Sequence, residues 1–73
     1  MTHPAHKLSP QAKHVLCSEC GYQGHFTAPK NETDRLKALV ELQAAGYGGI
    51  DEKDTFLETD AAHHAAEALL FNH

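Results

Sequence analysis

Two cysteines three positions apart are the residues of this 73-residue chain best suited to chemistry. Cys17 and Cys20 form a C-x-x-C pair, and Gly21 directly follows the second cysteine. Two thiolates at this spacing on a tight turn converge on one tetrahedral metal ion, while the backbone N–H groups of the turn offset their charge. Because a small secreted domain usually carries several disulfides, a single close pair favours reduced thiols in the cytoplasm.

The segment around the pair, residues 15–26, resembles one half of a zinc ribbon, in which two short strands flank the cysteine turn. A zinc ribbon has a second C-x-x-C pair, but this chain has no further cysteine, so any remaining ligands would have to be histidines. His14 and His25 flank the turn and are the first candidates. His63 and His64 are neighbours on a predicted helix and point about 100° apart, so at most one of them joins the same ion. Structural zinc is one expectation, and a metal-free remnant of a ribbon is the alternative.

Catalytic uses of these residues fit the sequence less well. A redox C-x-x-C pair places its first cysteine at a helix N-terminus within a strand–helix–strand framework, which this sequence does not predict. His63 and Glu67 lie one helical turn apart and can form an acid–base pair, but a surface ion pair is the simpler interpretation. No Ser–His–Asp order, phosphate-binding loop or metalloprotease motif is present. We therefore expect a protein without enzymatic activity.

The element expected to position the cysteines is a short β-hairpin. Ser9 and Pro10 are suited to the N-cap and first position of a short helical turn. That turn leads directly into residues 14–28, where two short extended runs around a glycine-containing turn predict the hairpin, and Pro29 ends it. Residues 1–8 show no periodicity and predict a flexible arm.

A first helix is predicted over residues 33–45. Asn31 or Thr33 is its expected N-cap, and acidic residues in its first turn favour the positive end of the helix dipole. Gly46 stands where a left-handed residue after the helix is wanted. The segment 46–50 is too rich in glycine for regular structure and predicts a loop.

A second helix is predicted over residues 61–71, with Thr59 or Asp60 as its N-cap. Its alanine-rich sequence has high helix propensity. Its apolar side is expected to pack on the first helix and contains Ala62, Ala66, Leu69 and Leu70.

The expected fold class is α+β, a short β-hairpin with a zinc-ribbon-like knuckle packed against two α-helices. We expect one small domain over residues 1–73. Residues 51–58 are ambiguous between one turn and a short strand that presents Phe56 and Leu57 to the core. No run of about 18 apolar residues is present to span a bilayer, and the first twenty residues lack the apolar stretch of a signal peptide. Both observations favour a cytoplasmic protein without a membrane partner.

Charge is divided unevenly along the chain. The net charge is −4 with histidines neutral, which argues against loose, charge-driven binding to nucleic acid. Through Lys37 there are five basic against three acidic residues, whereas from Ala38 onward one basic residue faces seven acidic ones. Such a division suggests a partner with charged patches of its own, and an ordinary solvated surface is the alternative.

A glycine-rich loop is the candidate partner-binding segment. Its candidate contact residues are Tyr47, Ile50, Asp51, Glu52 and Asp54. An aromatic side chain beside acids on a loop suits docking onto a basic protein segment. The alternative is an ordinary turn between helices with Tyr47 folded onto the core. Seven histidines also suggest a pH switch, although solvated histidines explain the same composition.

The whole sequence resembles small bacteriophage proteins that bind host RNA polymerase, from its M-T-H-P start through C-S-E-C-G-Y to G-Y-G-G-I-D and the alanine-rich end. The resemblance covers the full length. It implies a monomer in the infected bacterial cytoplasm that docks near the RNA exit channel, on the flap of the β subunit and the N-terminal part of β′. Such a regulator interferes with σ-dependent initiation, including σ displacement, and promotes antitermination at intrinsic terminators with a host elongation factor.

Charge adds two expectations to that resemblance. The acidic C-terminal half is expected to meet basic protein segments of the polymerase. Five basic residues are expected to lie near the nascent RNA: Lys7, Lys13, Lys30, Arg35 and Lys37. Two rival classes stay open, namely a zinc-knuckle module that binds nucleic acid by itself and a small adaptor that acts on another host machine.

Overall fold

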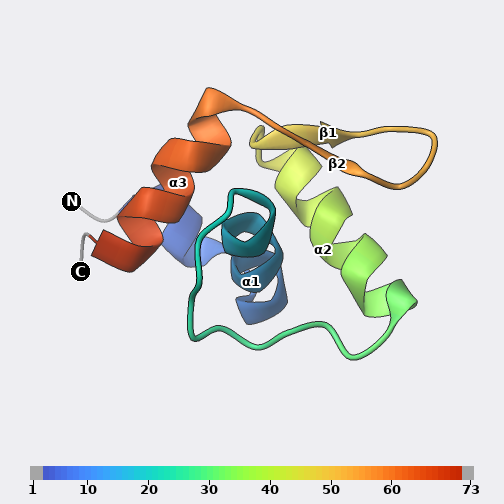
Figure 1. Ribbon diagram of the computed structural model, residues 1–73, viewed down its shortest axis with the longest axis horizontal. Coiled ribbons are helices and arrows are strands. Elements are labelled where there is room, and N and C mark those ends of the chain that lie inside the picture. Colours follow the sequence, from blue (N-terminus) through green and yellow to red (C-terminus); the bar gives the residue numbers. More distant parts are fainter. Residues whose placement is uncertain (1–2, 72–73) are drawn as a thin grey trace.

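The described part of the chain, residues 3–71 of a computed structural model, contains three α-helices, one 3-10 turn and a two-stranded antiparallel sheet (Figure 1). The elements in chain order are η1 (Pro4–Lys7), α1 (Pro10–Glu19), α2 (Glu32–Ala44), β1 (Gly48–Ile50), β2 (Phe56–Glu58) and α3 (Asp60–Phe71). The α+β class is therefore confirmed. The hairpin, however, lies in the second half of the chain and not around the cysteines.

Helix α1 and the irregular connection that follows it replace the hairpin expected over residues 14–28. Ser9 is its N-cap and accepts a hydrogen bond from the Ala12 amide, with Pro10 in the first turn, as the sequence indicates. The helix then continues to Glu19, because it buries a face at helical spacing that contains Ala12, Val15 and Leu16. The expectations of a short turn and of a zinc-ribbon-like hairpin at this place are wrong.

Helices α1 and α2 end in the same way. Gly21 after α1 has φ +83°, and the next residue, Tyr22, donates its amide to the Cys17 carbonyl at 2.8 Å. Gly46 after α2 has φ +87°, and the Tyr47 amide donates to a carbonyl in the last turn of that helix at 3.0 Å. Both are glycine C-caps, in which a left-handed glycine lets the chain satisfy the last carbonyls and leave the helix.

The two predicted helices are confirmed within one residue at each end. Asn31 caps α2 by accepting from the Asp34 amide at 2.9 Å, and Thr59 caps α3 by accepting from the Ala62 amide at 3.2 Å. Helix α3, however, packs against α1 and η1 and not mainly against α2, and Figure 1 shows α1 between α2 and α3. Close packing is possible because α3 presents small buried side chains, the alanine face, which consists of Ala62, Ala65 and Ala66.

The hairpin β1–β2 includes glycines that the sequence assigned to a loop. Gly48 pairs with Glu58, and Ile50 pairs with Phe56. A Cβ at Gly48 would overlap the Phe56 ring, so the glycine lets this buried ring lie across the strand. The neighbouring Leu57 points the other way and is 52% exposed, because successive strand residues face opposite sides. Only one of the two side chains expected in the core is there.

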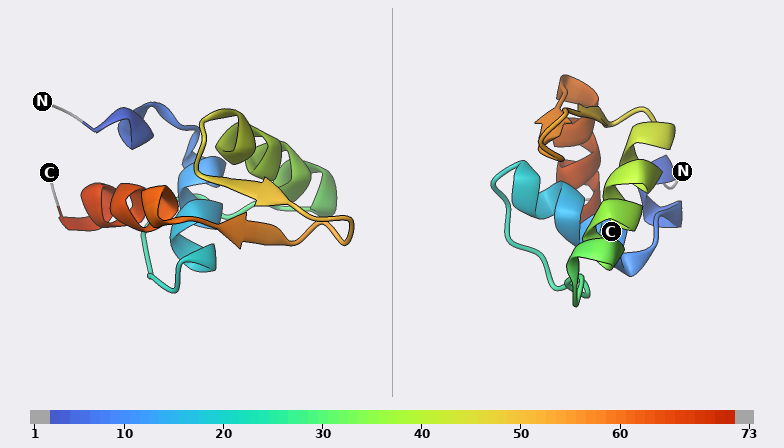
Figure 2. Two further views of the ribbon diagram at one scale, coloured as in Figure 1. Left: turned by 90° about the horizontal axis from the view of Figure 1, so that it is seen from above. Right: turned by 90° about the vertical axis from the view of Figure 1, so that its right-hand side faces the viewer.

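The core is assembled from all three helices and the hairpin, and its largest fully buried side chains are Leu16, Cys17, Leu39 and Leu42. The connection between α1 and α2 runs around the outside of the molecule (Figure 2). Within the expected arm, Pro4–Lys7 form η1 and Ala5 is fully buried, whereas Met1 and Thr2 lie outside the described residues. Flexibility of residues 1–8 stays a prediction.

Among the helices of residues 3–71, none combines the length and the apolar character that crossing a membrane requires.

Candidate functional site

The two cysteines predicted as metal ligands lie in different surroundings. Cys17 is inside α1 with 1% of its surface exposed, and burial raises the pKa of its thiol. Cys20 is the C-cap residue of the same helix and is half-buried. Because Cys17 belongs to the core, the pair does not present two thiols to one turn as a zinc knuckle does.

Cys20 meets two side chains from distant parts of the chain. Glu58 ends β2, and His63 lies near the start of α3. One ligand atom from each of the three residues lies within 4.8 Å of the other two. The His63 Nε2 atom is 3.3 Å from Glu58 Oε1. We call Cys20, Glu58 and His63 the Cys20 group.

Burial and the neighbouring carboxylate both favour the protonated form of the Cys20 thiol. Burial is the largest cause that raises the pKa of Cys20 to about 12. The negative charge of the neighbouring Glu58 carboxylate raises the pKa in the same direction. A divalent cation between these side chains would have the opposite effect, because it stabilises a thiolate and a carboxylate together.

The Cys20 group can hold a metal ion. It combines a thiol, a carboxylate and an imidazole, which are three side-chain types that bind transition metals. The residues come from three different elements, so an ion bound there would connect the end of α1 to β2 and α3.

The other predicted ligands lie elsewhere. His14 on α1 and His25 in the following connection line a groove of about 410 Å³, together with Ser18 and Tyr22. Neither histidine belongs to the Cys20 group. The histidine of the Cys20 group is His63, which the sequence offers only as a further candidate. The adjacent His64 is exposed.

The pair expected between His63 and Glu67 is replaced by two other contacts. His63 approaches Glu58 instead. The Glu67 carboxylate accepts a hydrogen bond from the Tyr22 hydroxyl at 3.1 Å, and this contact is the main cause that raises the pKa of Tyr22. The Tyr22 ring also lies edge-on to the His63 ring, with centroids 6.3 Å apart. The connection after α1 is thereby attached to α3 beside the Cys20 group.

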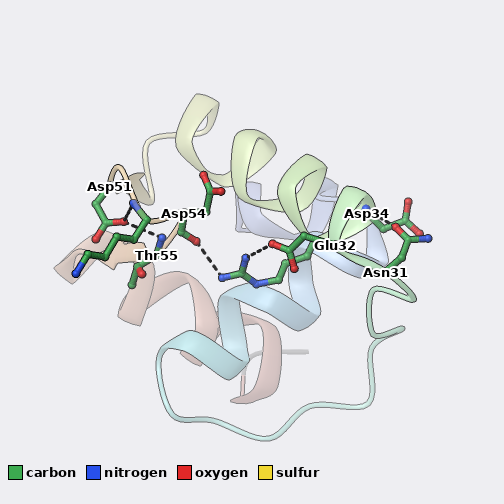
Figure 3. A network of polar contacts seen from close by, with 8 residues as sticks. Asn31, Glu32, Asp34, Asp51, Asp54 and Thr55 are labelled. Carbon is green, nitrogen blue, oxygen red and sulfur yellow. Dashed lines mark hydrogen bonds and ion pairs between the residues drawn. The ribbon is translucent and has the colours of Figure 1, made fainter.

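The acidic residues predicted for partner binding form the turn between β1 and β2. The Asp51 carboxylate accepts hydrogen bonds from the Lys53 amide at 2.8 Å and the Thr55 amide at 2.9 Å, so it shapes the turn (Figure 3). Glu52 and Asp54 are exposed, and Asp54 has φ +60°. We call residues 51–55 the acidic turn.

Arg35 attaches the acidic turn to α2. Its guanidinium donates to the Asp54 carbonyl at 3.0 Å and pairs with the Glu32 carboxylate at 2.9 Å (Figure 3). These contacts position the turn beside the N-terminal part of α2. They also mean that Arg35, expected near RNA, already has two acceptors within the chain.

The apolar residues predicted for partner binding are less accessible than the acidic ones. Tyr47 is 8% exposed and belongs to the core, with its ring centroid 6.5 Å from that of His3. Burial raises the pKa of Tyr47. Ile50 is half-buried. Tyr47 is therefore folded onto the core, as in the alternative to partner binding that the sequence left open.

The basic residues predicted to lie near RNA are distributed over several elements. Lys30 and Arg35 line one groove of about 360 Å³ beside α1, together with the acidic Glu19 and Glu32. Lys13 on α1 lies over the Phe26 ring, 5.7 Å from its centroid. The two others, Lys7 in η1 and Lys37 in α2, are exposed.

Glu58 is a site residue that sequence reasoning missed. No local pattern identifies it, since it is one acid among seven in the second half of the chain and meets Cys20 only through the fold. Comparisons with protein-family models, with curated proteins and with solved structures find no match to this chain.

Proposed function

We propose that this chain binds bacterial RNA polymerase and regulates transcription, as its resemblance to small bacteriophage regulators implies. In this proposal the protein acts as a monomer in the cytoplasm of the infected bacterium and has no catalytic activity of its own. It docks near the RNA exit channel, on the β flap and the N-terminal part of β′. There it inhibits σ-dependent initiation and promotes read-through of intrinsic terminators.

The acidic turn is the observation that carries the proposal. It lies at the end of the hairpin away from α3, and both Glu52 and Asp54 are exposed there (Figure 1). Three further acids of the second half are exposed, namely Glu58, Asp60 and Glu67. Lys53 is the single basic residue after Lys37. An acidic surface of this kind favours docking onto a basic protein segment, because complementary charge speeds encounter and excludes partners of like charge.

The shape of the turn also supports docking. A bound conformation that is already formed costs less conformational entropy on association. The hydrogen bonds of Asp51 and the contact from Arg35 hold the acidic turn in one arrangement. Asp51 is therefore assigned to the structure of the turn, and Glu52 and Asp54 to contact with the polymerase.

Structural zinc belongs to this proposal as an accompanying feature. The cysteine pair made zinc an expectation, and a small core benefits from a metal that connects its elements. Polymerase binding and zinc binding can each occur without the other.

The test is capture of RNA polymerase core and holoenzyme by the purified chain, with two variants of equal charge change. Glu52→Lys with Asp54→Asn alters the charge of the acidic turn and leaves Asp51 in place, and the left-handed backbone at position 54 is kept because asparagine tolerates positive φ. Glu19→Lys with Asp34→Asn makes the same charge change in the first half. We expect the turn variant to bind at least about tenfold more weakly, a loss of about 1.4 kcal/mol, and the control to bind as the native chain.

Two results would contradict the proposal. If the native chain captured neither form of the polymerase, polymerase binding itself would be rejected. If both variants lost affinity equally, net charge and not the acidic turn would determine binding.

A further inference from the structure

Three metal-binding side chains of different chemistry meet where α1 ends, β2 ends and α3 begins. The Cys20 group brings a thiol, a carboxylate and an imidazole together, with their ligand atoms within 4.8 Å of one another. Glu58 is exposed, while Cys20 and His63 are half-buried, so the group is open to solvent on one side. An ion can therefore enter without unfolding of the chain.

We propose that the chain binds one zinc ion through Cys20 Sγ, a Glu58 carboxylate oxygen and His63 Nε2, with water in the fourth position. This site differs from the knuckle that the sequence predicts, because Cys17, His14 and His25 take no part in it. It is independent of polymerase binding.

The spacing of the group fits a tetrahedral ion. Zinc binds nitrogen and oxygen at about 2.0–2.2 Å and sulfur at about 2.3 Å, which places neighbouring ligand atoms about 3.3–3.6 Å apart. His63 Nε2 and Glu58 Oε1 are already 3.3 Å apart. The sulfur is within 4.8 Å of both, so a rotation of side chains brings it to the ion.

The ligand types select the class of metal. Magnesium and calcium prefer sites built entirely from oxygen, whereas a thiolate with an imidazole favours zinc and its neighbours among the transition metals. A metal-free group, in which His63 pairs with Glu58 and the Cys20 thiol stays protonated beside that carboxylate, is the competing arrangement.

Bound zinc would stabilise the fold by connecting elements that are far apart in sequence. Cys20 is attached to α1, and the other two ligands are attached to the hairpin and to α3. A cross-link between such elements removes freedom from the unfolded chain and thus stabilises the folded one. We expect zinc to raise the melting temperature of the metal-free chain.

The test uses the full chain, freed of metal, and cobalt(II) as a spectroscopic substitute for zinc. Non-denaturing mass spectrometry is expected to show one zinc per chain. Cobalt is expected to give intense tetrahedral bands and a thiolate-to-cobalt charge-transfer band. Cys20→Ser should abolish the thiolate band, and His63→Gln should weaken binding at least about tenfold, because loss of even an outer-shell partner costs about that much.

His64→Gln is the matched control, since His64 is adjacent in sequence, exposed and outside the Cys20 group. It should bind zinc as the native chain does. Equal zinc binding by the native chain, Cys20→Ser and His63→Gln would overturn the proposal and assign the metal to other histidines. Failure of the native chain to retain zinc would overturn it as well.

A second measurement avoids variants that fail to fold. Zinc should protect Cys20 of the native chain from alkylation by N-ethylmaleimide, and removal of zinc by a chelator should end the protection. Mass spectrometry of the proteolytic peptide that contains Cys20 measures the alkylated fraction. Equal labelling of Cys20 with and without zinc would overturn the proposal.

Discussion

At the scale of single residues, two cysteines only three positions apart have different surroundings and therefore different chemistry. Cys17 acts as a small apolar side chain in the core. Cys20 lies at the end of the helix beside a carboxylate and an imidazole. Burial raises the pKa of both thiols, and the charge of Glu58 raises that of Cys20 further.

Glu58→Gln should make Cys20 of the metal-free chain more reactive. Removal of the negative charge of Glu58 lowers the pKa of Cys20, so more thiolate is present at about pH 8. Each unit of decrease raises the thiolate fraction about tenfold. The rate of iodoacetamide modification at Cys20 measures the effect, and Glu52→Gln is the control. An unchanged rate would show that Glu58 does not influence the thiol.

Gly48 is the residue at which the hairpin tolerates no side chain. A Cβ there would overlap the Leu57 carbonyl oxygen and the Phe56 ring. Gly48→Ala is therefore expected to destabilise the chain by about 1–3 kcal/mol in urea unfolding, as overpacking does. A Cβ at Gly49 in the same strand would meet no atom within 4 Å, and Gly49→Ala should change stability by less than about 0.5 kcal/mol. Equal effects would argue against this strand register.

At the scale of elements, local signals predicted α2, α3 and the N-cap of α1, because caps and helix propensity act within a few residues. The same local signals led to a wrong prediction at Gly21, which follows a helix and not a cysteine turn. A glycine after a helix and a glycine after a cysteine turn have the same sequence signature, and the cysteine pair favoured the turn. The Gly-Tyr dipeptide that ends α1 also ends α2, where the helix had been predicted.

The hairpin and the Cys20 group required information that the sequence does not display locally. Strand β1 contains two glycines and is stabilised by pairing with β2 and by the Phe56 ring, which are tertiary contacts. Likewise, Cys20 meets Glu58 only after the hairpin and α3 have packed beside α1. The sequence therefore indicated Cys20 and offered His63 as a further candidate, but nothing in it pointed to Glu58.

Ser9→Ala tests whether α1 is a helix. The Ser9 side chain caps the Ala12 amide and also donates to the Glu41 carboxylate of α2 at 2.8 Å. Loss of the cap should lower the free energy of unfolding by about 1 kcal/mol. Ser18→Ala, on the exposed side of the same helix, is the control and should have little effect. A neutral Ser9→Ala would contradict the capped helix.

At the scale of the whole molecule, titration of the thiols of Cys17 and Cys20 is expected to make the fold sensitive to alkali. The folded pKa of Cys20 is about 12, against 9.0 for a free thiol, and burial raises that of Cys17 too. The unfolded chain therefore loses these protons at lower pH than the folded chain. Their contribution to stability is complete below about pH 9 and is lost as pH rises through the folded values.

The free energy of unfolding is thus expected to fall between about pH 9 and pH 11, measured with urea on the metal-free chain. Cys20→Ser should show a smaller decrease over the same interval. A decrease of equal size in the variant would assign the alkaline sensitivity to other groups.

The charge division leads to a separate expectation about transcription. Lys7, Lys30 and Lys37 are exposed, whereas Lys13 and Arg35 have contacts within the chain. If the proposed docking is correct, changing the three exposed lysines to glutamine should reduce terminator read-through and leave polymerase capture intact. Lys53→Gln in the acidic turn is the control, and unchanged read-through in the triple variant would separate these lysines from RNA.

The alanine face of α3 also bears on how the gene can change. A single-base change that replaces an alanine produces valine, threonine, serine, proline, glycine, aspartate or glutamate. At Ala62, Ala65 and Ala66 these replacements are larger, charged or poor helix formers, and all three sites are fully buried against neighbouring elements. The outer side of the same helix carries no such restriction. Accepted substitutions in α3 should therefore lie mostly on the side that faces solvent. On the buried side, a larger residue should be accepted only together with a smaller side chain on the neighbouring element.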